Sequence, residues 1–258
     1  MTDWSAFAGV AGVVLTVLLV LARLSQGAVP GGSTAEPAAR GTDRTLPDDV
    51  EGPQPLERAD DGPVAPTPEL GPVVLLANVA VSQGTLGVLL VFAAWWTAVP
   101  ASALGVDPAA FAPVPLAAGA AAGGALYLAN ETAATVGRRY GVEGAEAFRA
   151  ALAPESRRGW AVLLLVVLPV VAAFEELLFR GALVGALSAG FGVSPWLLAG
   201  LSSVAFAAGH GAQGRLGVVV TGVLGFALAA VFVLTGSLAA AVVAHYLVNA
   251  LEFVVNER

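Results

Sequence analysis

Several apolar stretches of about twenty residues, each almost free of charge, constrain this chain more than any other feature of its sequence. One stretch of that length is enough to cross a bilayer. Backbone polar groups in lipid must be satisfied internally, so spanning segments are helices or closed barrels. The apolar runs here are continuous and do not alternate, which favours helices. The sequence therefore predicts an all-α, polytopic transmembrane helix bundle in the cell membrane.

About seven spans with an N-out/C-in orientation satisfy the distribution of arginine, which prefers cytoplasmic loops. With the N-terminus outside, Arg23, the Arg-rich stretch 131–159 and Arg258 all fall inside. The loops near Asp107, Gly190 and Gly236 fall outside and carry no arginine. The expected segments are Trp4 to Ala22, Val73 to Val99, Pro115 to Asn130, Trp160 to Leu187, Pro195 to Ala212, Leu216 to Leu234 and Ser237 to Val255.

Four regions follow from these segments. Residues 1–25 predict an N-terminal transmembrane anchor, because no basic residue precedes the apolar run as it would in a signal peptide. Residues 26–70 are acidic and rich in Pro and Gly, which predicts a disordered linker. Residues 71–158 would hold accessory transmembrane helices and the Arg-rich cytoplasmic loop. Residues 159–254 would form a catalytic membrane domain, for the reasons that follow.

The fourth apolar segment contains three ionisable residues, Glu175, Glu176 and Arg180. A charge at the bilayer centre costs about 2.5–3.5 kcal/mol on insertion scales, so such residues usually have a function. Glu176 and Arg180 are four residues apart and share a helix face, which predicts a structural ion pair. Glu175 is turned about 100° away. It is left free, and a poorly solvated carboxylate is a better base. Alternatively, all three residues hold helices together.

The only two histidines of the chain, His210 and His245, lie in the apolar segments near its C-terminus. Phe206 precedes His210 by four residues, and Asn249 follows His245 by four, so each pair shares a helix face. Both histidines could instead be satisfied core groups. Other polar residues of the segments, such as Gln83, Ser202 and Ser203, are typical of interhelical hydrogen bonds. Ser237 is a predicted helix N-cap.

These residues, in this order, resemble a known family. Glu175-Glu176-x-x-x-Arg180, then Phe206-x-x-x-His210, then His245-x-x-x-Asn249 resemble the motifs of the CPBP intramembrane proteases. That family includes the type II CAAX-prenyl endopeptidases and the bacteriocin-processing or immunity (Abi) proteins. The resemblance covers about residues 160–253.

The resemblance implies an intramembrane endopeptidase that hydrolyses a peptide bond of a membrane-associated peptide or protein. Glu175 and His210 would activate a water, and His245 and Asn249 would hold the oxyanion of the tetrahedral intermediate. Glu176, Arg180 and Phe206 would support them. No cofactor is required on this hypothesis, although Glu175, His210 and His245 are also a plausible zinc set. The partners are the substrate and the lipid bilayer. The acidic composition gives no reason to expect nucleic acid.

Two other functions stay open at this level: a non-catalytic membrane scaffold or immunity protein, and a proton-coupled transporter that uses the buried Glu and His. The catalytic hypothesis also makes a demand on geometry. Glu175 and His210 lie 15 residues into segments that start from opposite membrane faces. They can meet near mid-membrane only if segment four starts below the inner interface or segment five starts above the outer one. We therefore predict that segment four is long and tilted.

Overall fold

The computed structural model describes residues 1–26, 72–139, 149–150 and 152–257 of the chain. Its regular structure is helical throughout, which confirms the expected all-α fold. Residues 27–70 of the predicted linker and most of the loop 140–151 lie outside the described residues. The long elements are α1 (Trp4–Gln26), α2 (Pro72–Trp96), α3 (Pro113–Arg139), α8 (Pro195–Gly209), α9 (Gly214–Thr235) and α10 (Leu238–Asn256), with the fourth segment described below.

Five helices in the described part are long and apolar enough to cross a membrane, against about seven expected spans. The two others are α3 and α8. α8 has only 15 residues, and α3 is not among the five candidates although it has 27 residues. α3 also continues nine residues beyond the expected end at Asn130, so Arg139 lies in its last turn. A basic residue is favoured there by the negative end of the helix dipole. The number of spans and their orientation stay predictions.

The fourth segment is one continuous helix from Arg157 to Phe191. It comprises α5 (Arg157–Val162), η3 (Leu163–Val167), α6 (Leu168–Glu176), η4 (Leu177–Ala186) and α7 (Leu187–Phe191), of which η3 and η4 are π-helical. π-Turns within α-helices occur frequently at functional sites. η4 begins directly after Glu176, and its Phe179 carbonyl accepts a hydrogen bond of 2.7 Å from the Ser202 hydroxyl.

This long helix removes the expected difference in depth between Glu175 and His210. A turn at residues 192–194 joins it to α8. Glu175 lies 16 residues before Phe191, and His210 lies 15 residues after Pro195. At 1.5 Å per residue both are about 22–24 Å from the shared turn. The length of segment four is therefore as predicted, and its tilt in the membrane stays a prediction.

His210 is not inside a helix, contrary to the segment boundary at Ala212. α8 ends at Gly209, and His210 follows with φ −106° and ψ 23° before the short 3-10 helix η5 (Gly211–Gln213). Glycines at 209, 211 and 214 weaken the helix here, because glycine has a low helix propensity. The side chain of His210 is consequently placed by a helix end and a turn.

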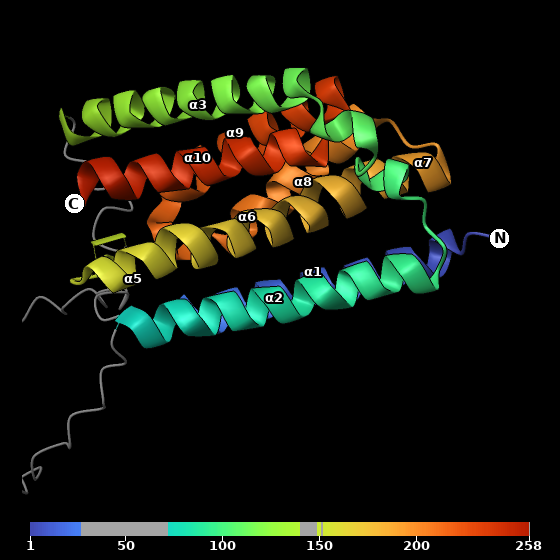
Figure 1. The fold of residues 1–258 in the computed structure, drawn as a ribbon, viewed down its shortest axis with the longest axis horizontal. Helices are drawn as coiled ribbons and strands as arrows, with labels where there is room; N and C mark the ends of the chain where they lie inside the picture. The colour runs from blue at the N-terminus through green and yellow to red at the C-terminus, as the bar shows by residue number, and fades with distance from the viewer. Residues whose placement is uncertain (27–71, 140–148, 151, 258) are drawn as a thin grey trace, which may run out of the picture.

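The connections that carry no arginine lie at the end of the bundle that holds the N-terminus. The Asp3 amide donates to the Thr97 carbonyl, and Leu238 N–H donates to the Gly105 carbonyl, each at 2.9 Å. Gly105 belongs to a connection with two 3-10 turns, η1 (Ala101–Leu104) and η2 (Pro108–Phe111). Ser237 caps α10 as predicted, accepting from Ala240 N–H. Figure 1 shows the chain termini at opposite ends of the bundle and α3 alongside α10.

Candidate active site

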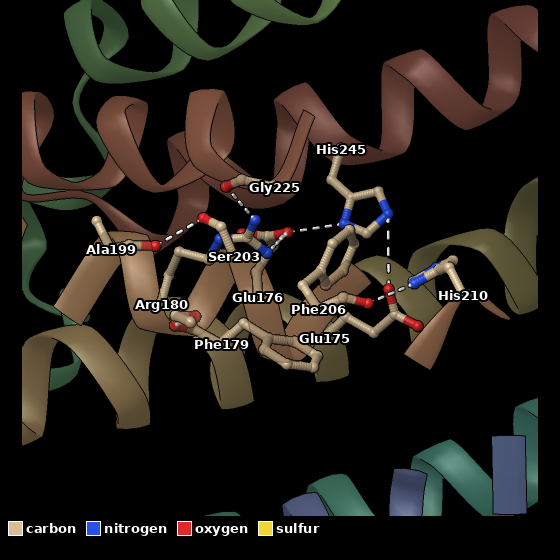
Figure 2. A network of polar contacts seen from close by, with 11 residues as sticks. Glu175, Glu176, Phe179, Arg180, Ala199, Ser203, Phe206, His210, Gly225 and His245 are labelled. Carbon is tan, nitrogen blue, oxygen red and sulfur yellow. Dashed lines mark hydrogen bonds and ion pairs between the residues drawn. The ribbon is translucent and has the colours of Figure 1, made fainter. Parts of the chain in front are cut away.

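The ion pair expected within segment four is present and fully buried. Arg180 Nη1 donates to Glu176 Oε1 at 2.8 Å, and both side chains have no exposed surface. Arg180 Nη2 donates to the Gly225 carbonyl of α9 at 2.6 Å. The guanidinium also stacks on the ring of Phe206, 4.8 Å from its centroid. Arg180 therefore ties the fourth segment to α8 and α9 (Figure 2).

His245 connects to both glutamates. Its Nδ1 lies 2.7 Å from Glu176 Oε1, and its Nε2 lies 3.8 Å from Glu175 Oε2. Since the Glu176 carboxylate is paired with Arg180, it accepts from His245, and Nδ1 carries the proton. Nε2 then offers either a lone pair or, in the doubly protonated ring, a donor N–H. Glu176 is thus more than the partner of Arg180, because it also fixes the orientation of His245.

His210 is oriented in the same manner by the backbone. Its Nδ1 lies 2.8 Å from the Phe206 carbonyl, which can only accept, so Nδ1 carries the proton and Nε2 is free to accept. The two rings pack at 4.6 Å between centroids. Phe206 also meets Phe179 and His245 edge-on. The expected pairing of Phe206 and His210 is therefore present, and it works through the Phe206 carbonyl as well as its ring.

Glu175 is buried, with 6% of its surface exposed, and has a partner that the sequence did not predict. Gln83 of α2 donates from Nε2 to Glu175 Oε1 at 3.2 Å. The sequence suggested only an interhelical hydrogen bond for Gln83. No signal in the sequence pairs it with Glu175, because 92 residues separate the two.

One cavity of about 870 Å³ collects the predicted residues. Glu175, Phe206, His210, His245 and Asn249 all line it. In Figure 2 the Glu175 carboxylate is drawn between the rings of the two histidines. Asn249 is one turn after His245 on α10 and is half-buried. The structure therefore brings the four predicted catalytic residues to one space, with Glu176 and Arg180 packed behind them.

Further along the same cavity lies a polar cluster that sequence reasoning missed. Glu252 accepts a hydrogen bond from Asn130 of α3 and pairs with Arg149 at 3.5 Å. All three residues line the cavity. The spacing of His245, Asn249 and Glu252, at positions i, i+4 and i+7, places them on one helix face and was a usable signal.

The suggested zinc ligands do not form a metal site in this arrangement. Within the described residues, no three His, Cys, Asp or Glu side chains lie close enough together to hold one ion. The Nδ1 atom of each histidine is already engaged, which leaves the two Nε2 atoms and the Glu175 carboxylate at the cavity.

Fold and site together define an all-helical membrane protein with a buried ionisable site. Residues 157–251 match the family model described as "Type II CAAX prenyl endopeptidase Rce1-like", and this match supports the expected resemblance to the CPBP intramembrane proteases. The match runs from α5 into α10 and leaves α1, α2 and α3 outside. The comparison with curated proteins and the comparison with solved structures give no match.

Proposed function

We propose that this protein is an intramembrane endopeptidase in which Glu175 and His210 activate the attacking water. The observation that carries the proposal is the shared cavity, which Glu175, His210, His245 and Asn249 all line. A carboxylate and a ring nitrogen with a free lone pair are two acceptors that can hold and deprotonate one water. The substrate is a peptide or protein that reaches the cavity from the membrane or its surface.

In this mechanism the water oxygen attacks the scissile carbonyl carbon while the Glu175 carboxylate takes one of its protons. His210 Nε2 accepts the other water hydrogen bond and fixes the water's direction. The carbonyl oxygen becomes an oxyanion, which Nε2–H of a doubly protonated His245 and the Asn249 amide stabilise. The C–N bond then breaks, and the proton on Glu175 moves to the departing amine nitrogen. One donor in such an oxyanion site contributes about 2.7–4 kcal/mol.

The test uses the purified full chain in liposomes with a mixture of peptides of randomised sequence, and cleavage is read by mass spectrometry. Glu175→Gln keeps the shape of the side chain and removes the base, so we expect no cleavage and an unchanged melting temperature. Glu155→Gln, at an exposed position outside the cavity, is the matched control and should cleave normally. Cleavage by Glu175→Gln at the wild-type rate would contradict the assigned role. Intact peptides with the wild-type protein would favour the non-catalytic alternative.

A further inference from the structure

Gln83 lies on α2, outside the region that matches the family, yet it reaches the proposed base. Its Nε2 is 3.2 Å from Glu175 Oε1. Gln83 lines a second, apolar groove of about 640 Å³ between α2 and α6, together with Gly84, Val170 and Phe174. An apolar side chain of the same length would fit these surroundings. The amide at this position therefore requires a reason other than packing.

The amide uses only half of its hydrogen-bonding capacity. Gln83 Oε1 is buried and has no hydrogen-bond partner in the described part of the structure. A buried acceptor without a protein partner is unfavourable. Rotation of the terminal amide by half a turn would exchange the two ends, since this torsion has two broad, nearly equivalent positions.

The two ends of the amide suit the two protonation states of Glu175. The NH2 group donates to a carboxylate, whereas the carbonyl oxygen can accept only from a protonated carboxyl. In the proposed reaction Glu175 gains a proton from water and later gives it to the leaving amine. We propose that Gln83 is a positioning residue that holds Glu175 in both protonation states. Its NH2 group donates to the ionised carboxylate, and its carbonyl oxygen accepts from the carboxyl while Glu175 carries the proton. This inference rests on the proposed function and extends its site to α2.

Four variants in the same liposome assay test the inference. Gln83→Met removes the amide and keeps the length of the side chain, so we expect kcat to fall about tenfold to a hundredfold, with KM little changed. Gln83→Asn keeps an amide on a shorter chain and should recover part of the rate. Gln83→Lys offers donors and no acceptor, so it supports only the carboxylate and should also be slow. Asn78→Met, at an exposed amide on the same helix, is the matched control and should match the wild type.

The outcomes separate this inference from the proposed function. If Glu175→Gln is inactive and Gln83→Met keeps the wild-type kcat, the positioning role is wrong while the protease assignment stands. Full activity of Gln83→Lys would overturn the acceptor half of the inference. A melting temperature of Gln83→Met well below that of Asn78→Met would show a structural role instead and would also overturn it. If the wild-type protein cleaves no peptide, the proposed function itself fails.

Discussion

At the scale of single residues, Glu176 has two roles, of which the sequence predicts only one. Helical spacing predicts its ion pair with Arg180, because residues four apart on a helix are neighbours. The bond to His245 Nδ1 could not be predicted, since the two residues are 69 positions apart in the sequence and only the packing of α10 against α6 brings them together. All of this falls on one oxygen, Oε1, while Oε2 has no hydrogen-bond partner among the described residues.

Removing one member of the buried pair should therefore be worse than removing both. Glu176→Leu leaves the Arg180 guanidinium buried without its counter-charge, and we expect a loss of about 3–5 kcal/mol in the free energy of unfolding. The double variant Glu176→Leu/Arg180→Met removes both charges and should be more stable than Glu176→Leu. Unfolding of the purified variants in detergent by a titrated denaturant measures both values.

The double variant should nevertheless be inactive, because His245 has lost the carboxylate that orients its ring. This pairs a stability readout with an activity readout on the same protein. A double variant less stable than Glu176→Leu would mean that the pair is not the electrostatic unit described above. A double variant with wild-type cleavage would show that His245 needs no orientation from Glu176.

At the scale of elements, hydropathy located the helices but not the features that position the site. The apolar runs gave α2, α9 and α10 within a few residues of their observed ends. They could not show that α8 stops at Gly209, because hydropathy does not distinguish a helix that ends at Gly209 from one that ends at Ala212. Hydropathy also could not predict the π-helical turns of segment four, where the Phe179 carbonyl accepts a hydrogen bond from Ser202 of another helix.

The packing of α3 on α10 depends on glycines that hydropathy treats as ordinary apolar residues. A Cβ placed on Gly123 would lie 2.8 Å from the Ala244 carbonyl oxygen and 2.9 Å from Leu247 Cβ. A Cβ placed on Gly119 would lie even closer to the carbonyl oxygen of Ala240. Small residues allow membrane helices to approach each other closely. Because α3 and α10 both line the catalytic cavity, their separation sets its shape.

Gly123→Val should consequently push α3 away from α10. We expect a loss of about 1–3 kcal/mol in stability, the usual cost of overpacking, together with reduced cleavage. Gly124→Val is the matched control on the same helix, because a Cβ at Gly124 meets nothing within 4 Å. Thermal unfolding in detergent and the peptide assay compare the two variants. Equal effects of both substitutions would show that helix propensity, and not the contact with Ala244, is responsible.

At the scale of the whole molecule, the part outside the family match belongs to the same core. Phe7 and Val14 of α1 are almost fully buried in one cluster with Phe174 and Phe179, which flank the Glu-Glu pair. Sequence reasoning predicted residues 1–25 as a separate anchor and could not predict this packing, because α1 is apolar on every side. Together with Gln83, the cluster connects the N-terminal helices to the proposed active site.

The orientation of this bundle in the membrane is a prediction that the chain is well suited to test. The sequence has no cysteine, so a single introduced cysteine is the only thiol. Ala109 in the connection after α2 and Glu155 before α5 are both exposed. The arginine distribution predicts that Ala109 faces outward and Glu155 faces the cytoplasm. Ala109→Cys should therefore react with a membrane-impermeant maleimide in intact cells, and Glu155→Cys should react only in inverted vesicles.

The same pair of variants also tests whether the number of crossings is odd. The Asp3 amide bonds the Thr97 carbonyl, so the N-terminus lies at the end of the bundle that holds the Ala109 connection. Labelling of Ala109→Cys from outside thus places the N-terminus outside as well. Glu257, next to the C-terminal residue, pairs with Arg149, which is close in sequence to Glu155, and it should share the side of Glu155. Leu238 at the start of α10 bonds Gly105 near Ala109, and Glu257 after its end pairs with Arg149. Outside labelling of both variants would contradict N-out/C-in, because it would place both ends of α10 on the outer face.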